Sequence, residues 1–185
     1  MKKLILLLTA FIGLSATAQK LGTVNSQEVL LTLPEVKIMQ GKLQAKNDEL
    51  TKQLEGMYKT YEEKVGDYQK NEKTMSASIK DLKAQEIKDL EGRIQKFQQS
   101  AQQEIQELER TLTAPLLEKT KKAIQDVSKE LGYSHVFDIV TGALLVWPDT
   151  NDITKQVKIK LGIDPNAKPI AAPNNQSNEG MPVKR

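Results

Sequence analysis

A run of about eighty residues without proline is the feature that most constrains the fold of this chain. It extends from Glu35 to about Thr113, and its apolar residues recur mostly in steps of three, four or seven. Such steps place apolar side chains along one stripe of an α-helix with coiled-coil character. Hydrophobic residues make up 38% and aromatic residues 4% of the chain, which is low for a single large core. We therefore expect long helices rather than a compact globule.

The stretch 68–78, YQKNEKTMSAS, has the lowest apolar content within this run. It predicts a chain reversal that divides the run into two legs, each of about 40 residues and roughly 60 Å in length. The alternative is one uninterrupted helix, which would need a partner chain to bury its apolar stripe. On the return leg, a step of five residues between Leu82 and Ile87 breaks the heptad pattern.

Charges of both signs are interspersed along the helical run. Residues 35–113 contain about 14 Lys and Arg against about 15 Asp and Glu. This balance is typical of a solvated helix surface on which neighbouring turns carry opposite charges.

Residues 1–18 are predicted to be a signal peptide. Lys2 and Lys3 precede an apolar run from Leu4 to Leu14, and small residues follow up to Ala18. This order predicts export and cleavage after Ala18; the alternative is an uncleaved membrane anchor. Because the chain has no cysteine to acylate, a lipoprotein is not expected. Disulfide bonds are absent for the same reason, so stability must come from packing or oligomerisation. Cleavage would remove Lys2 and Lys3 and lower the formal net charge from +3 to about +1, which disfavours nucleic-acid binding.

Short elements are predicted before the helical run. Leu21 to Val24 has the character of a strand, and Asn25 or Ser26 can cap the short helix that follows. Pro34 fits the first turn of the next helix, because its missing N–H has no partner there in any case.

After the run, Pro115 is expected to open another helix, which Gly132 caps at its C-terminus. The stretch 133–150, YSHVFDIVTGALLVWPDT, is apolar and β-branched on both sides of Thr141-Gly142. Two such runs around a glycine-containing link predict a β-hairpin. A lone hairpin is marginally stable in water, so several copies of the chain are expected to pair it, together with the first strand, into a shared β body.

The remaining residues predict one more helix and a tail. In 148–163 a turn is followed by Asn151 or Asp152 as a helix cap, and one helix face carries Ile153, Val157 and Leu161. Residues 164–185 are rich in Pro, Asn and Ala and have no apolar period, which predicts a flexible tail.

No catalytic constellation is evident in the sequence. His135 is expected to be packed or solvated, and Asp138, three residues on in an extended strand, would point to the opposite face. Glu62-Glu63 is interpreted as helix surface, and no nucleophile, phosphate-binding or zinc motif is present. We therefore expect no enzyme activity, no metal and no cofactor.

Two stretches of the sequence resemble the Skp family of periplasmic chaperones, also called OmpH-like. They are LGTVNSQEVLLTLPEVK and LLEKTKKAIQDVSKELGYSHVFDIVTGALLVWPDTNDITKQVKIKLG, and the charged Gln-rich helical run lies between them. The resemblance covers residues 20–163. It implies a mainly α fold with a small β body, in which a jellyfish-like homotrimer carries α-helical coiled-coil hairpin arms around a cavity.

The resemblance further implies an ATP-independent periplasmic holdase that takes unfolded outer-membrane proteins into this cavity. Nucleic acid is not an expected partner. Peripheral contact with a membrane is compatible with a periplasmic holdase. The alternative function is a structural coiled-coil spacer or envelope adaptor, which would bind one folded partner and ignore unfolded chains. The chain then divides into 1–18 as signal peptide, 19–34 and 115–163 as body, 35–114 as arm, and 164–185 as tail.

Two sets of residues are assigned on this basis. The predicted assembly residues are Leu21, Val24, Val136, Phe137, Ile139, Leu144, Val146 and Trp147; alternatively they form an ordinary monomer core. The predicted client-binding residues are Met57, Tyr58, Tyr61, Tyr68, Met75 and Phe97, since Met is adaptable and Tyr amphipathic; alternatively they pack the two legs together. The arms of well-known relatives are described as basic, whereas the charge balance here predicts that capture depends more on apolar contacts.

Overall fold

The computed structural model describes residues 19–142 and 144–171. The predicted signal peptide and the part of the predicted tail from residue 172 onward lie outside the described residues. The chain divides into two compact units. Of the described residues, we call the unit that contains residues 19–29 and Thr120–Ala167 the body, and the unit that contains Leu30–Lys119 and residues 168–171 the arm.

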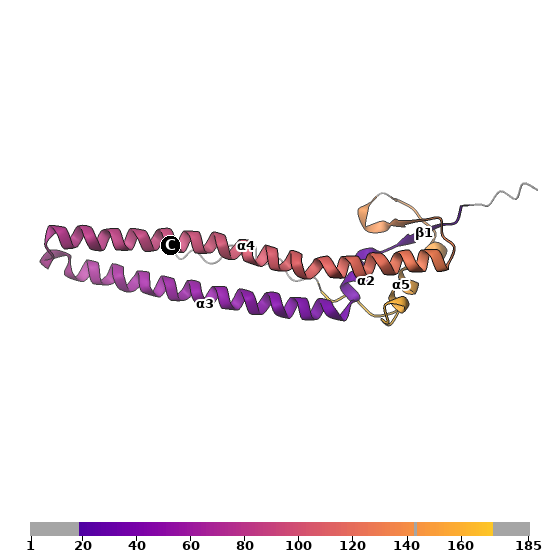
Figure 1. Ribbon diagram of the computed structural model, residues 1–185, viewed down its shortest axis with the longest axis horizontal. Helices are drawn as coiled ribbons and strands as arrows, with labels where there is room; N and C mark the ends of the chain where they lie inside the picture. Colours follow the sequence, from indigo (N-terminus) through magenta and orange to yellow (C-terminus); the bar gives the residue numbers. More distant parts are fainter. Residues whose placement is uncertain (1–18, 143, 172–185) are drawn as a thin grey trace, which may run out of the picture. The chain divides into compact units, whose positions relative to one another are not determined.

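Two long antiparallel helices form the arm (Figure 1). Helix α3 spans Pro34–Asn71, the 3₁₀ helix η1 spans Glu72–Thr74, and helix α4 begins at Ala77. The chain reverses inside the predicted stretch, so the arm is a helical hairpin rather than one uninterrupted helix. Pro34 lies in the first turn of α3, where its missing N–H costs nothing.

The prediction that Pro115 opens a separate helix is wrong. Helix α4 runs without interruption from Ala77 to Glu130, with Pro115 inside it. An internal proline removes one backbone hydrogen bond, here to the carbonyl of Thr111, and costs about 3 kcal/mol. Ala101 before it and Leu116 after it are both buried, and packing on both sides of the proline outweighs this local cost.

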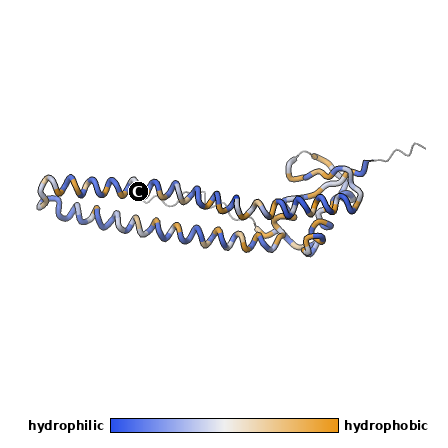
Figure 2. The backbone as a smooth tube through the Cα atoms, in the orientation of Figure 1, coloured by the Kyte–Doolittle hydropathy of each residue, from blue (hydrophilic) through white to orange (hydrophobic). Residues whose placement is uncertain are grey.

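Apolar side chains from both legs meet inside the arm. Leu54 of α3 packs with Leu90 and Ile94 of α4, and all three are at most 5% exposed. Figure 2 shows apolar positions recurring along both helices, as the predicted stripe requires. Met57, Tyr58, Tyr61 and Phe97 are partly buried against this cluster.

The sheet of the body consists of two short parallel strands. Strand β1, Leu21–Val24, pairs with strand β2, His135–Asp138, with Leu21 opposite His135 and Val24 opposite Asp138. Thr23 also forms an isolated bridge with Asp152, so part of the other edge of β1 is covered. Within the described chain, the outer edge of β2 has no strand partner.

The prediction of a β-hairpin in 133–150 is wrong for this chain by itself. After β2 the chain enters a 3₁₀ helix, η2, at Ile139–Thr141, and residues 144–147 are not a strand. The side chain of Asp138 accepts a hydrogen bond from the amide of Val140, and Gly142 has φ 69°. These local interactions bend the chain away from an extended return strand, and β2 pairs instead with the distant β1.

The body core is formed by the sheet, the end of α4 and two short helices, α2 at Ser26–Thr32 and α5 at Thr154–Lys160. Its buried members come from all of these elements or from residues directly beside them; they are Val24, Val29, Ala123, Val127, Ile153 and Val157. The predicted apolar face of the last helix is thereby confirmed, because Leu161 also packs against this cluster.

Side chains and glycines define the helix ends in the body. Asn25 Oδ1 accepts a hydrogen bond from the amide of Glu28 at 2.9 Å, which makes Asn25 rather than Ser26 the cap of α2. Gly132 follows α4 with φ 72°, and the amide of Tyr133 donates to the carbonyl of Ser128, which is the Schellman arrangement expected after a helix. Asp152 Oδ1 accepts from the amide of Thr154 at 2.8 Å at the start of α5.

Candidate functional site

The polar residues that the sequence singles out do not form a reaction site. His135 is exposed, and Asp138 is used structurally: it accepts hydrogen bonds from the Ser26 hydroxyl, from the Ser26 amide at 3.3 Å and from the Val140 amide at 3.2 Å. Among residues 19–142 and 144–171, no group of three or more His, Asp or Glu side chains is arranged to hold a metal ion. The surfaces of the arm and the body therefore remain as the candidate functional sites.

Four of the six predicted client-binding residues take part in packing the two legs of the arm. Met57, Tyr58, Tyr61 and Phe97 lie half-buried against the arm core. The Tyr61 hydroxyl donates to Glu91 at 2.7 Å, and this hydrogen bond, with burial, raises the pKa of Tyr61. These contacts fit the alternative role in leg packing, and they leave only part of each side chain available to a ligand.

The other two predicted residues, Tyr68 and Met75, are also half-buried and lie near the turn of the hairpin. Beyond the turn, Ile79 and Leu82 of α4 are 43% and 57% exposed. Both belong to the apolar residues that recur at helical spacing along the return leg. For Leu82 the sequence contains a signal of this exposure, because the step of five between Leu82 and Ile87 moves Leu82 out of register with the buried positions that follow.

Two further apolar side chains of the arm, Ile38 of α3 and Leu117 of α4, are also exposed. We call Ile38, Ile79, Leu82 and Leu117 the exposed arm set. An exposed aliphatic side chain is ordinary when it stands alone, so the set is of interest only together with the other properties of the arm.

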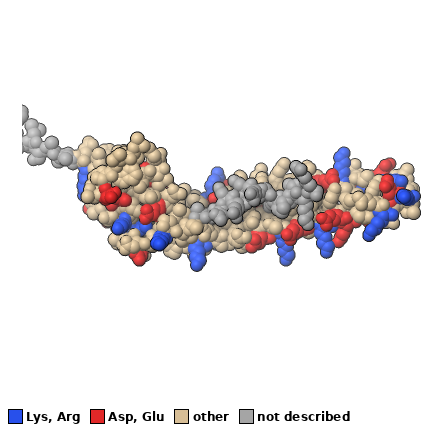
Figure 3. All heavy atoms as spheres, turned by 180° about the vertical axis from the view of Figure 1, so that it is seen from behind, with Lys and Arg blue, Asp and Glu red and all other residues tan. Residues whose placement is uncertain are grey.

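Paired charges connect the two legs of the arm. Lys46 Nζ lies 3.1 Å from Glu104 Oε2, and Lys64 and Lys83 each lie 2.7 Å from a carboxylate oxygen of Glu86 and Asp67, respectively. The hydrogen bonds from these lysines lower the pKa of Glu86 and of Asp67. Figure 3 shows acidic and basic side chains alternating along the visible face of the arm, without a large area of one sign.

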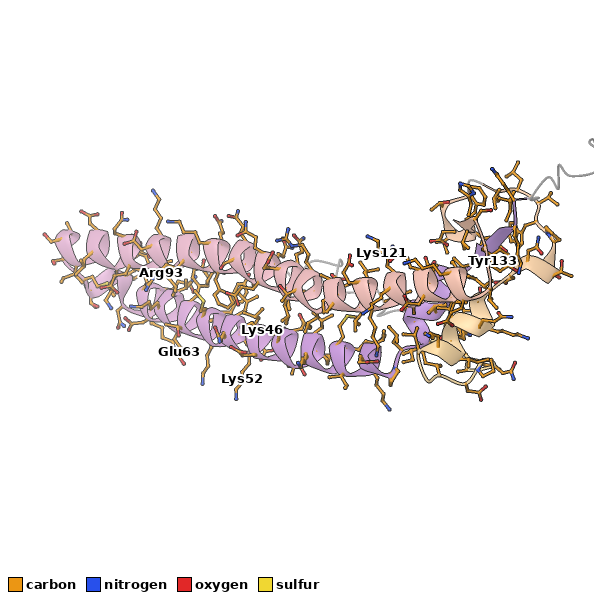
Figure 4. All side chains as sticks on the ribbon, turned by 45° about the vertical axis from the view of Figure 1, so that its right-hand side comes forward. Lys46, Lys52, Glu63, Arg93, Lys121 and Tyr133 are labelled. Atoms are coloured by element: carbon orange, nitrogen blue, oxygen red, sulfur yellow. The ribbon has the colours of Figure 1, made fainter. Side chains whose placement is uncertain are left out.

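Other charged side chains of the arm extend into solvent. Figure 4 shows Lys52 pointing away from the facing helix. Because the two signs are interleaved, the arm generates no strong long-range field of one sign, and the predicted dependence of capture on apolar contacts is consistent with this surface.

The predicted assembly residues fall into two groups in the body. Val24 belongs to the core of the chain itself, and Val136 packs against that core. Ile139, Leu144 and Trp147 are half-buried, whereas Leu21, Phe137 and Val146 are exposed. Val140 and Leu145, which are not among the predicted assembly residues, are exposed as well. We call Leu21, Phe137, Val140, Leu145 and Val146 the exposed body set.

These elements define a class of protein: a long α-helical hairpin arm joined to a small β-containing body, without a recognisable reaction centre in the part of the chain that the structure describes. The predicted mainly α fold with a helical hairpin arm and a small β body is thereby confirmed. The sequence matches the family described as "Outer membrane protein (OmpH-like)" over residues 20–161. The chain belongs to this OmpH-like family. Membership supports a periplasmic chaperone-type role in general terms, and the family is a non-enzymatic one.

A search of the curated proteins finds no match to this chain. Over the described residues, none of the helices combines the length and the apolar character needed to cross a membrane.

Proposed function

We propose that the chain is an ATP-independent holdase that binds unfolded outer-membrane proteins in the periplasm and prevents their aggregation. The observation that carries this proposal, beyond family membership, is an arm on which isolated exposed aliphatic side chains are set among balanced charges. Such a surface suits many weak contacts with unfolded apolar segments, because no single strong site is needed when contacts are numerous. Release then requires only that a folded client presents nothing to bind.

Client contact on this proposal involves the exposed arm set and the accessible edges of the six predicted residues. Met57, Tyr58, Tyr61 and Phe97 offer adaptable or amphipathic surface where they are not packed, and Tyr68 and Met75 add to this near the hairpin turn.

We further propose that the active form is a homotrimer assembled through the bodies, with client held in a cavity between arms. Two observations support assembly through the body: among the described residues the outer edge of β2 has no strand partner, and in the exposed body set Leu145 and Val146 are about nine-tenths exposed. An unpaired strand edge beside exposed aliphatic residues favours pairing with another chain. Export and cleavage after Ala18 place the mature chain, beginning at Gln19, in the periplasm.

The experiment that tests the holdase proposal uses the mature chain without ATP. A urea-unfolded outer-membrane β-barrel protein is diluted into it, and light scattering is followed as the amount of chain increases. Suppression of scattering that saturates near one trimer per client is expected. No suppression by a folded trimeric chain would contradict the proposal and favour a spacer or adaptor that binds a folded partner.

The exposed arm set is tested by the double variant Ile79→Ser, Leu82→Ser. Both side chains are exposed, so the arm is expected to keep its helix content by circular dichroism while suppression weakens. Asp81→Ser is the matched control, because Asp81 lies between them and is also exposed. Equal suppression by the double variant and the control would remove these residues from the client surface.

A further inference from the structure

Residues 168–171 lie against the arm, which makes two hydrogen bonds to their main chain. They form neither helix nor strand, and they lie beside the start of α3 (Figure 1). The amide of Ile170 donates to the carbonyl oxygen of Leu31 at 2.8 Å. Nε2 of Gln40 donates to the carbonyl oxygen of Ala171 at 2.7 Å. The arm therefore holds two main-chain groups of this segment, and the Ile170 side chain between them is half-buried.

A break between α2 and α3 creates the acceptor in this site. In an uninterrupted helix the carbonyl of Leu31 would accept from the amide four residues on, that of Glu35. Leu33 instead has extended backbone angles, φ −63° and ψ 130°, as is usual for a residue before proline, and α3 starts afresh at Pro34. The Leu31 carbonyl is one of the terminal acceptors that α2 cannot pair internally, and the Ile170 amide pairs it. Gln40, in the second turn of α3, adds a donor.

We propose that this is a subsite for an extended apolar segment of an unfolded client, which residues 168–171 occupy until a client displaces them. The inference rests on the proposed holdase function. Both hydrogen bonds address main-chain groups, so they can be made to any extended sequence, and the side chain accommodated is aliphatic. The family match ends at residue 161; Leu31 and Gln40 lie inside it, and the occupying segment lies outside it.

The segment acts as a tethered competitor. Its tether keeps its effective concentration at the subsite high, so a client must exchange contacts rather than bind an empty surface. Freeing the subsite is expected to strengthen client binding about threefold to tenfold, which corresponds to one net hydrogen bond.

Hydrogen exchange at the Ile170 amide tests the displacement directly. This amide is expected to be protected in the full chain alone and to lose protection when a urea-diluted, unfolded outer-membrane β-barrel is added to saturation. Amides in the arm core, such as that of Ile94, should stay protected and serve as the internal reference. Unchanged protection at Ile170 with client bound would overturn the proposal.

Two full-chain variants distinguish the contribution of the segment from that of the subsite that holds it. Ile170→Pro removes the donor, so it should release the segment and tighten client binding. Gln40→Leu removes a donor of the site, so it should lower Ile170 protection without tightening client binding. Gln44→Leu is the matched control, because Gln44 lies one turn further along α3 and its amide pairs with Asp48 at 2.8 Å instead.

A fluorescent peptide with the sequence of residues 168–173, KPIAAP, provides a second readout. It should bind the Ile170→Pro variant more tightly than the parent chain and than Gln40→Leu. If the parent chain binds client but Ile170→Pro changes neither client nor peptide affinity, the subsite proposal fails and the holdase proposal stands. If no form of the chain binds client, both fail.

Discussion

Lys158 Nζ lies 2.7 Å from Glu28 Oε1, although the lysine side chain is only 1% exposed. The same ammonium group donates to the carbonyl oxygen of Ala167 at 3.0 Å. A charge this deeply buried is tolerated only when it is paired and hydrogen-bonded. The ion pair therefore holds together three segments of the body: α5, the start of α2, and the residues that follow α5.

The two partners of this ion pair should respond unequally to substitution. Glu28→Gln leaves the Lys158 charge buried without a counter-charge and is expected to lower the free energy of unfolding by about 2–3 kcal/mol. Lys158→Met removes the charge and keeps the volume, so a loss of about 1 kcal/mol or less is expected. Urea unfolding at one fixed protein concentration measures both values. A larger loss for Lys158→Met would contradict the buried-charge argument.

The ring of Tyr133 lies so close to Gly22 that we expect position 22 to require a glycine. A Cβ at position 22 would lie 2.9 Å from ring atoms of Tyr133, whose ring also has Lys20 Nζ 4.2 Å from its centroid (Figure 4 labels Tyr133). Gly22→Ala should therefore cost about 1–3 kcal/mol of unfolding free energy through overpacking. Thermal unfolding provides the measurement.

The control for this prediction is Gly66→Ala in α3, where an added Cβ meets nothing within 4 Å. That substitution should stabilise the chain by about 0.5–1 kcal/mol, because alanine favours the helix. A double variant with Tyr133→Ala should recover part of the loss caused by Gly22→Ala. Strict additivity of the two losses would show that the ring contact is not the cause.

Assembly through the body predicts that Val146→Asp abolishes the trimer. Val146 is 89% exposed in the single chain, so the substitution should leave the helix content of each chain unchanged while it places a charge in the interface. Trp147→Asp and Gly142→Val are expected to act in the same direction, the latter because Gly142 has φ 69°, which valine avoids. Light scattering with size-exclusion chromatography reports the molar mass.

Leu82→Asp on the arm is the control for the assembly variants, since it adds the same charge to an exposed position outside the body. It should remain trimeric. A trimer of unchanged mass for Val146→Asp and Trp147→Asp would rule out assembly through this face.

The ion pairs of the arm predict loss of stability in acid. Hydrogen bonds from Lys83, Lys64 and Lys119 lower the pKa of Asp67, Glu86 and Glu35, respectively. This contribution is fully present above the ordinary carboxyl pKa of about 4 and is lost as the pH falls through the lowered values of the folded state. The melting temperature should therefore decrease below about pH 4, and less so in high salt, which already screens exposed pairs.

The same ion pairs also predict a loss of stability at high pH. Hydrogen bonds to Asp67 and Glu104 raise the pKa of Lys83 and Lys46, so their contribution persists below the ordinary lysine pKa and is lost as the pH rises through the raised values. Replacing Lys83 by Gln should flatten the acid dependence, because Asp67 then loses its partner. An unchanged acid profile for Lys83→Gln would show that this pair does not contribute.

Local patterns in the sequence predicted the arm well. The proline-free run with helical apolar steps corresponds to α3 and most of α4, and the polar stretch 68–78 contains the turn. Burial of Leu54, Leu90 and Ile94 follows from the same steps. These features are predictable because a helix forms its hydrogen bonds within a few residues of sequence, so its signals are local.

The sequence by itself thus determined the helical hairpin, the strand at Leu21–Val24 and the membership in a family. Tertiary structure decided the partner of β2, the continuity of α4 through Pro115, the burial of Lys158 and the seating of Ile170 on the carbonyl of Leu31. The strand partner, the ion pair and the peptide contact each join segments more than a hundred residues apart, and packing on both sides carries the helix through its proline. Local sequence patterns cannot predict contacts of this kind, because these contacts stabilise the chain only after distant segments have packed together.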